Sequence, residues 1–579
     1  MHLVHRCLTQ MRQLKLRCLL LSMSTAGALA GVIAPAYTMS FDAAAQADEI
    51  QRRQAQELEQ QRARAEQRPD VLSETESSSI DMDAWALPDE TPCFPLAAIL
   101  WQGDSPPATI QATAQSAIGR CVGLQGLNVL QAHLTMRLVD LGLITAWVRV
   151  PEQSLAEGSL TLRYGAGRIS EVRSEGAPGW WRTVLPSGPG DELNQRDLDQ
   201  ALENIQRLKG QSDARIDIAP GTALGASDVL LQPGSGKRWH AYIGGDNAGL
   251  KTMGNKRLNA GLTVDSPLFL YDQLSVSWNS NAGLRNHDNN TRAASVYYSV
   301  PFGYWTMFAS AGRSRYRQTV SGFEEPIVYG GTTQQVDAGV LVVPYRGSHN
   351  KGTIVAKVLR KRVGGTLNGI DIEVQRRDVM GYELGYQHRH YVGRTVVDAG
   401  AGMRGTVPRY SKQPGYVYGD PGWDGRTTIL AATAGAYMPF TLAQQQMAYQ
   451  FNWQFQHAKT PIVPADYFTI GDRYTVRGFD GQMTLTAEDG WSLRNDLSWN
   501  LSTLGQQLYA GVDAGRVSGP SAQYLSGRTL VGAVAGLRGR ISVPYIDTSY
   551  DVSLGWPLKK PDAFPTSNVV FAAALMFEF

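Results

Sequence analysis

A stretch of eleven residues, 471–481, carries the clearest candidate for a specific charged contact. Its sequence is Gly-Asp-Arg-Tyr-Thr-Val-Arg-Gly-Phe-Asp-Gly, and at its centre is the tetrad Val476, Arg477, Gly478 and Phe479. Glycines beside an arginine and an aromatic residue suit the tip of a tight loop, because glycine adopts positive φ angles and lets the backbone aim the arginine. Arg477 needs an anionic partner, and Asp513 offers one. An ordinary hairpin turn is the alternative interpretation of the tetrad.

Other motifs with known chemistry are weak. Gly400, Gly402 and Gly405 match the dinucleotide pattern G-x-G-x-x-G, but Thr-Val-Pro follows where that fingerprint requires a helix. His388 and His390 share one face of a predicted strand, where lining of a polar lumen is favoured over binding of a metal. The sequence has no phosphate-binding loop, zinc-protease motif or nucleophile elbow. We therefore predict no enzyme activity, no cofactor and no metal.

The composition favours a membrane barrel. Only 18% of the 579 residues are charged, against roughly 25% in typical soluble proteins. The net charge of +2 gives no indication of nucleic-acid binding. Beyond the N-terminus the chain has no apolar run of about 18 residues, which a membrane-spanning helix would require. A transmembrane β-barrel needs only alternating hydrophobicity and fits these observations.

The N-terminal residues predict an exported protein. Residues 1–47 have a basic front, an apolar core and a small-x-small cleavage site at 45–47, so they are typical of a signal peptide; cleavage after Ala30 is the alternative. Residues 48–68 predict a helix that is polar all round and would suit a watery lumen or a solvated tail. Residues 69–88 predict a flexible linker.

Two tandem α/β modules are predicted next, at 89–165 and 166–233. Each shows the order β-α-α-β-β, with helices in the second module expected at 180–185 and 198–208. Small sheets of this kind leave a strand edge free to pair with an extended peptide. Cys93 and Cys121 are the two cysteines left in the exported chain; a disulfide is the simplest interpretation, and two buried thiols the alternative.

Residues 234–579 predict the barrel itself. In 447–456 the residues Tyr449, Phe451, Trp453 and Phe455 alternate with glutamine and asparagine, which suits a lipid-facing wall around a wet lumen. At roughly 20–24 residues for a strand with its connection, the length of this region predicts about 14–18 strands, each with about 10 residues crossing the membrane. The final strand places four large apolar residues on one face and ends on an aromatic carboxy-terminus, as barrel-closing strands do: Phe571, Leu575, Phe577 and Phe579.

In this order, the features resemble two-partner secretion outer-membrane transporters of the hemolysin-activator type, in the superfamily of the barrel-assembly insertase. The cysteines match those of the family's first polypeptide-transport-associated (POTRA) module, and the stretch 509–515, with Gly511 and Gly515, resembles a later strand motif. The resemblance implies a 16-stranded barrel after two POTRA modules. It also implies a lumen plugged by the N-terminal helix and by the loop that carries Arg477, and a large β-helical secreted partner (an adhesin, cytolysin or toxin).

We therefore predict a secretion pore in the outer membrane of a Gram-negative bacterium, with its POTRA modules in the periplasm. It would recognise an unfolded partner and pass it outward without ATP. The other predicted partners are the barrel-assembly machinery and the lipid and lipopolysaccharide of the outer membrane, with no nucleic acid. An insertase-like assembly factor and a passive diffusion porin are the alternatives.

On the strand around Asp513, alternation places this residue in the lumen, opposite an approaching Arg477.

Overall fold

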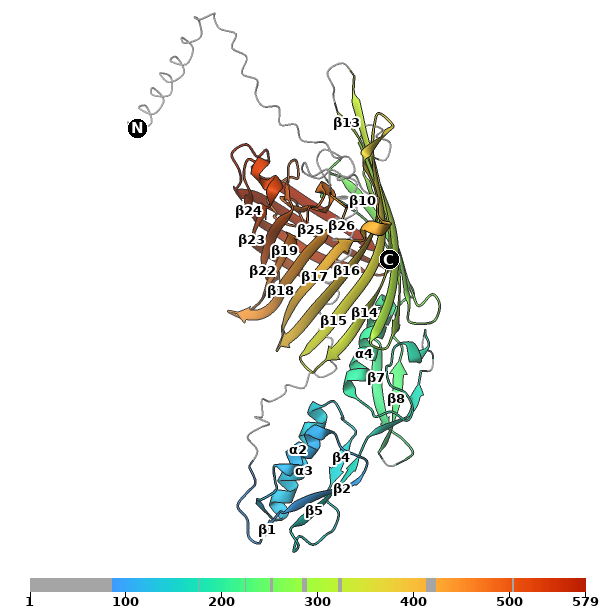
Figure 1. Cartoon of the computed structure of the whole chain (residues 1–579), viewed down its shortest axis with the longest axis vertical. Coiled ribbons are helices and arrows are strands. Elements are labelled where there is room, and N and C mark those ends of the chain that lie inside the picture. The colour runs from blue at the N-terminus through green and yellow to red at the C-terminus, as the bar shows by residue number, and fades with distance from the viewer. Residues whose placement is uncertain are drawn as a thin grey trace, which may run out of the picture. The chain divides into compact units, whose positions relative to one another are not determined.

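The computed structural model describes residues 86–579 apart from 175, 177, 224, 250–253, 284–288, 321–324, 413–422 and 502–504. Two small α/β modules and a closed barrel make up this part of the chain (Figure 1). The predicted signal peptide (1–47), the polar helix (48–68) and most of the linker (69–88) lie outside the described residues. None of the described helices is long and apolar enough to cross a membrane.

Module one is a three-stranded sheet with two helices. Strand β5 (Ser159–Gly165) lies between β2 (Ala98–Gly103), to which it is parallel, and β4 (Trp147–Arg149), to which it is antiparallel. Helices α2 (Ala108–Gln115) and α3 (Leu124–Asp140) contribute the rest of its core. The buried leucines of α3 recur every four residues and therefore share one face of the helix; they are Leu130, Leu134 and Leu138.

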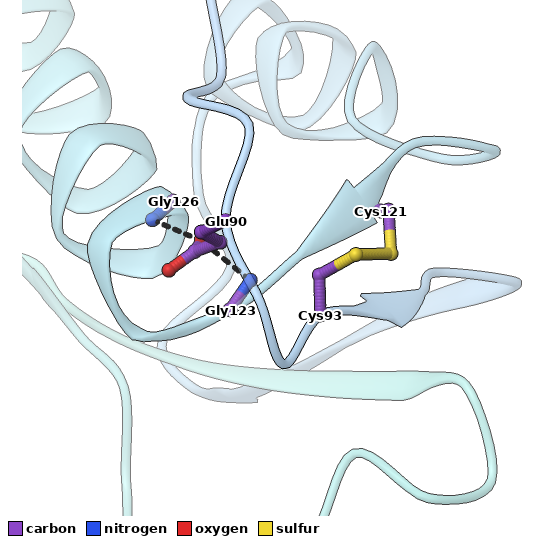
Figure 2. The surroundings of a disulfide bond; sticks show 5 residues. All are labelled: Glu90, Cys93, Cys121, Gly123 and Gly126. Atoms are coloured by element: carbon purple, nitrogen blue, oxygen red, sulfur yellow. Dashed lines mark hydrogen bonds between the residues drawn. A yellow bond between two sulfur atoms is a disulfide. The ribbon is translucent and has the colours of Figure 1, made fainter.

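A disulfide and a carboxylate tie the start of module one to helix α3 (Figure 2). Cys93 is bonded to Cys121 in β3 (Cys121–Val122), which pairs with β1 (Phe94–Pro95), so the predicted disulfide is confirmed. Three residues before Cys93, Glu90 accepts hydrogen bonds from the backbone N–H groups of Gly123, Gln125 and Gly126, at 2.6, 2.8 and 2.7 Å. These N–H groups belong to the first turn of α3 and lack partners within the helix.

This contact shifts the acidity of Glu90. Removal from water raises the pKa of the carboxyl, but the backbone hydrogen bonds from Gly126, Gln125 and Gly123 outweigh it and hold the pKa below its ordinary value. The positive end of the helix dipole also favours a carboxylate at this place. Glu90 therefore caps α3 from outside the helix, where the N-cap residue Gly123 has no side chain to do so.

Module two repeats the plan with one difference. Its sheet has the order β6 (Arg168–Arg173), β8 (Ala226–Gln232), β7 (Arg215–Pro220), and α4 (Gln195–Gln206) packs on it. The helix expected at 180–185 forms only as one helical turn, η1 (Trp181–Thr183), with the backbone N–H groups of Val184 and Leu185 bonded to the carbonyl of Trp181. Pro186 follows directly, and because the residue before a proline disfavours the helical conformation, the turn does not continue beyond Leu185.

Sixteen antiparallel strands form the closed barrel, and this confirms the predicted fold class. The last strand pairs with the first, which closes the ring. The strands, in chain order, are β9 (Trp239–Asp246), β10 (Arg257–Asp265), β11 (Gln273–Asn281), β12 (Asn289–Phe302), β13 (Trp305–Val320), β14 (Ile327–Arg346), β15 (Asn350–Leu367), β16 (Ile370–Val392), β17 (Thr395–Thr406), β18 (Thr428–Leu442), β19 (Gln445–Ala458), β22 (Asp489–Leu501), β23 (Gln506–Ser518), β24 (Thr529–Val543), β25 (Ile546–Lys559) and β26 (Val570–Glu578).

Helix α4 of module two contacts one end of the barrel. The Asn204 side chain donates to the carbonyl of Gly303 in the β12–β13 turn (2.8 Å). Glu203 accepts from Lys351, in β15, at 2.9 Å and forms an ion pair with Arg346, at the end of β14. Because several turns contact one helix, this end of the barrel is the one that faces module two.

Candidate functional site

The stretch 471–481 lies in the long connection between β19 and β22. Strands β20 (Phe468–Ile470) and β21 (Leu485–Ala487) pair as a short hairpin whose tip contains the tetrad. Val476 and Phe479 are buried in an apolar cluster with Val517 of β23 and Leu530 of β24. Val517 and Leu530 are buried on the inner face of the barrel wall, whereas Val512, on the outer face, is exposed. The loop is therefore folded onto the inner wall of the barrel and is not an external turn.

Asp513 on β23 receives three hydrogen bonds from Arg477. The Arg477 backbone N–H and Nε donate to Oδ2 at 3.0 and 2.6 Å, and Nη2 donates to Oδ1 at 2.8 Å. Asp513 is fully buried and Arg477 is only 8% exposed. A bidentate arginine–carboxylate pair is a strong and directional contact. The structure thus brings together the two residues that the sequence analysis had paired.

The contact occupies a break in the barrel wall. Strands β22 and β23 are paired as far as Leu493–Ala514 and again from Leu497–Ala510. The residues between these two pairs are not paired across the strands. In the break, the backbone N–H of Asn495 donates to Asp513 (3.2 Å) and its carbonyl accepts from Arg477 Nη2 (3.2 Å). Arg477 and Asp513 therefore satisfy backbone groups that an unbroken ladder would have paired.

Sequence reasoning missed a second carboxylate at this place. Asp496 of β22 lies 2.6 Å from Arg477 Nη2 and also faces Arg538 of β24 at 3.7 Å. Its contact with Arg477 is an ion pair, and it lacks the hydrogen-bond alignment that Asp513 has. The sequence did show that Asp496 lies on the polar, inward side of the alternating strand 491–499. It did not distinguish Asp496 from the other polar residues on that side.

Glycines on three adjacent strands make room for the loop. A Cβ at Gly511 of β23 would lie 1.9 Å from the carbonyl oxygen of Asn495 on β22 and 3.1 Å from Arg477 Nη2, and one at Gly532 of β24 would lie 1.8 Å from the Arg477 carbonyl oxygen. A Cβ at Gly555 of β25 would lie 2.8 Å from the Cα of Gly478. Gly515, from the same sequence motif as Gly511, is in contact with Val476. Gly532 and Gly555 were not singled out from the sequence.

Gly478 is required by its own backbone as well. Its φ of +98° is in the left-handed region, and a Cβ there would meet the carbonyl oxygen of Trp556 at 2.5 Å. The residues after it are held by the connection between β25 and β26. Phe479 packs edge-to-face on Phe564, with centroids 5.7 Å apart, and Asp480 accepts from Ser567 at 2.7 Å. The tip is thus fixed from both sides.

A cavity of about 500 Å³ lies between the loop and strands β9–β11 and β22–β26. Its lining is strongly charged and carries Arg473, Arg494, Arg538 and Arg540 together with Asp246, Asp496 and Asp551. The loop also reaches the closing strands, because Arg473 Nη1 donates to the carbonyl of Ala573 in β26 (3.3 Å). Charged side chains of both signs therefore line the space between the loop and the wall.

The four residues of the predicted closing signal lie on the outer face of β26. Phe571 is 56% exposed and Leu575 43%, and Phe577 and Phe579 share that face. The backbone N–H of Phe579 donates to the carbonyl of Ala241 in β9 at 2.9 Å. The carboxy-terminal aromatic residue therefore lies at the seam that closes the ring.

The prediction for the histidine pair is wrong. His388 and His390 alternate with the inward residues of β16 and follow Leu384 and Tyr386, which are 50% and 45% exposed, on the outer face. The rings of His388 and His390 are stacked, with centroids 6.2 Å apart. The prediction that the two histidines share one strand face is correct. They were assigned to the lumen because they are polar, and this assignment is wrong. Among the described residues, no cluster of three or more histidine, cysteine or acidic side chains could hold a metal.

Comparison with protein families gives three matches. Residues 225–539 match the family described as haemolysin secretion/activation protein ShlB/FhaC/HecB. Residues 98–164 match the ShlB-type POTRA domain, and residues 168–220 match a POTRA domain. The first of these spans more than half of the chain.

Curated relatives and solved structures agree with these matches. The chain is 32% identical over 559 residues to the outer membrane transporter CdiB-2 of Burkholderia pseudomallei (strain 1026b), covering 93% of this chain and 95% of the relative. It is 28% identical over 539 residues to the hemolysin transporter protein ShlB of Serratia marcescens, with 92% and 91% covered. The structure of CdiB from Escherichia coli superposes with a TM-score of 0.81 at 24% identity, covering 92% of this chain and 98% of that one. CdiB from Acinetobacter baumannii gives 0.79 at 25%, with 92% and 99% covered.

Proposed function

Because the chain belongs to the ShlB/FhaC/HecB family of haemolysin secretion/activation proteins, it is an outer-membrane transporter of two-partner secretion, and we propose that it secretes one large partner protein in an unfolded state. Its POTRA modules are periplasmic, as in the rest of the family. The partner would be a long β-helical protein with adhesin, cytolytic or toxin activity. Transport of this kind needs no bond-making step and no cofactor.

One observation supports the proposal most directly: the charged lumen is occupied by a loop that polar contacts hold against the inner wall. Arg477 holds the loop through Asp513 and Asp496, and glycines of β23, β24 and β25 let the loop lie directly against the wall. An ion pair of this kind keeps the pore closed to solutes in the resting state. It is also a contact that a passing chain of mixed charge can compete for. The polar helix at 48–68 would fill the remaining lumen.

Recognition of the partner would begin on the POTRA modules. Strand β2 pairs only with β5 within the described residues, so its second edge is open. Leu100 on this strand is 54% exposed. An extended segment of the partner could add to this edge through backbone hydrogen bonds, with apolar side chains near Leu100. The contacts of α4 with the barrel turns would then deliver the segment to the pore.

The free energy for export would come from folding of the partner outside the cell, because the periplasm has no ATP. The barrel itself would be delivered to the membrane by the barrel-assembly machinery, which would read the closing strand that ends in Phe579.

Reconstitution tests this proposal. The full chain is placed in sealed vesicles without nucleotide, and a urea-denatured segment of its secreted partner is added on the POTRA side. We expect the segment to become protected from protease inside the vesicles, and a denatured unrelated protein of equal length to remain sensitive. Protection of both proteins, or of neither, would contradict selective export driven without ATP.

A further inference from the structure

Six arginines lie on the outer face of strands β12, β13 and β15, and we refer to them as the arginine belt. All six side chains are exposed. They lie toward the barrel end opposite module two, since β13 begins at Trp305, directly after the turn that Asn204 of α4 contacts. The members of the belt are Arg292, Arg313, Arg315, Arg317, Arg360 and Arg362.

Strand register brings these arginines together. Arg292 lies directly opposite Arg315 on the neighbouring strand. Arg313 lies opposite Gln334 of β14, and Gln334 lies opposite Arg362 of β15. Adjacent strands are about 4.8 Å apart, so the backbones at Arg313 and Arg362 are separated by only about 10 Å. Like charges in directly opposite positions destabilise a sheet unless an anion lies between them.

The protein itself neutralises only part of this charge. Arg360 and Arg362 both pair with Asp378 of β16, at 2.9 and 3.1 Å. The other four arginines, Arg292, Arg313, Arg315 and Arg317, form no ion pair within the part of the chain that the structure describes. The outer face here therefore carries more positive than negative charge.

The height of the belt matches a lipid headgroup region. Along the outer face of β13, Trp305, Met307, Ala309 and Ala311 precede Arg313. At about 3.4 Å per residue and a tilt of about 40°, Arg313 lies roughly 20 Å and Arg317 roughly 30 Å above Trp305 along the membrane normal. The apolar band of such barrels is about 25 Å tall. Measured from Trp305, the arginines of β13 thus span the height at which such a band ends, on the side of the outer leaflet.

We propose that the arginine belt is a binding site for the phosphate groups of lipopolysaccharide. Guanidinium groups bind phosphate in a bidentate manner, and a row of them above an apolar wall fits a ligand with phosphates at the base of acyl chains. The glycolipid would lie with its acyl chains on the Trp305–Ala311 face and its phosphates between Arg292 and Arg315 and between Arg313 and Arg362. This site is distinct from the lumen and does not depend on secretion.

Binding of labelled lipopolysaccharide to the delipidated full chain in neutral detergent, followed by fluorescence anisotropy, tests the proposal. The variant replaces the four unpaired arginines: R292Q, R313Q, R315Q and R317Q. Because the variant loses four guanidinium groups that would form charge-assisted hydrogen bonds to phosphate, we expect its affinity to fall at least about tenfold. The matched control removes four exposed arginines from the POTRA modules, R149Q, R163Q, R182Q and R215Q, and should bind as the unmodified chain does.

Two further arms identify the ligand chemistry. Lysine at the same four positions should restore most of the binding, and phosphatase-treated lipopolysaccharide should bind the unmodified chain as weakly as intact lipopolysaccharide binds the glutamine variant. A heat-dependent shift in gel mobility shows that each barrel is folded; if the quadruple variant does not fold, R292Q/R315Q replaces it. Equal binding by the unmodified chain and the glutamine variant would overturn the proposal. So would an equal loss in the POTRA control, or full binding of the dephosphorylated lipid.

Discussion

Arg477 donates to Asp513 from three nitrogen atoms, one of the backbone and two of the side chain, across 36 residues of sequence. The backbone contact matters as much as the guanidinium, because it positions the tetrad itself and not only the arginine side chain. The pair lies in the break between β22 and β23, so the loop is part of the wall's hydrogen bonding at that point. Movement of the loop would require rearrangement of the wall.

The glycine contact at β24 predicts that G532A displaces the loop. A Cβ there would lie 1.8 Å from the Arg477 carbonyl oxygen, a backbone atom that has no rotamer with which to move away. We expect secretion to fall sharply while the barrel still inserts, as measured by partner protein in the medium and by heat-dependent gel mobility. G385A is the control, because a Cβ at Gly385 meets its nearest neighbour only at 3.8 Å. Secretion by G532A at the level of G385A would contradict the packing described.

The two carboxylates around Arg477 should have unequal effects. D513N removes the aligned bidentate contact, whereas D496N removes an ion pair without hydrogen-bond alignment. We expect D496N to reduce secretion, but by less than D513N, because charge-assisted hydrogen bonds are the stronger contacts. Equal losses, or no loss in D496N, would show that the order inferred from geometry is wrong. Both variants are compared at equal amounts of inserted barrel.

Glu90 predicts an acid-sensitive module one. Its pKa is lowered in the folded protein by the N–H groups of the first turn of α3. A carboxyl with a lowered folded pKa contributes stability above its ordinary pKa, and the contribution is lost as the pH falls through the folded value. We expect E90Q to be less stable at pH 7 than the unmodified chain and the two to converge on acidification toward pH 3.

Limited proteolysis of module one in the full chain, followed across this pH range, measures the effect. E157Q is the matched control, since Glu157 is an exposed carboxylate of the same module. A constant difference between E90Q and the unmodified chain at every pH would assign the loss to packing and not to the charge.

The disulfide closes a separation of 28 residues and should stabilise module one. In the chain-entropy account a loop of this length contributes about 3.5 kcal/mol. We expect C93S/C121S to raise the sensitivity of module one to protease in urea, while the barrel fragment remains intact. Non-reducing mass spectrometry of the unmodified chain should show the linked peptides. If reductant leaves the protease sensitivity of module one unchanged in both chains, the bond does not contribute to the stability of the folded module.

Much of the architecture follows from local sequence. The period of two and the aromatic outer residues indicate the barrel, and the C-terminal Phe571–Phe579 alternation indicates its closing strand. The pairing of Arg477 with Asp513 came from motif resemblance together with alternation. The alternation is a short-range pattern that a single sequence displays directly, whereas the partner of Arg477, 36 residues away, was identified through the resemblance to the family.

What sequence could not supply is register. Gly532 and Gly555 are two of 60 glycines, and only the strand pairing places them beside Gly511 under the loop. Part of the arginine belt is visible in the sequence, because Arg313, Arg315 and Arg317 alternate along one strand. Its other members lie on different strands, and only strand pairing brings them together. His388 and His390 failed for a related reason: polarity suggested the lumen, whereas the pleat places them on the outer face.

The central claim is that Arg477 and Asp513 act as one clasp on the loop, and a double-mutant cycle on secretion tests it most directly. The amount of partner secreted per inserted barrel is measured for R477A, D513A and R477A/D513A. Residues that share one contact are not additive, so we predict that each single variant loses most secretion and that the double variant loses little more than R477A alone. If the two reductions instead multiply in the double variant, the residues act separately and the clasp does not hold the loop.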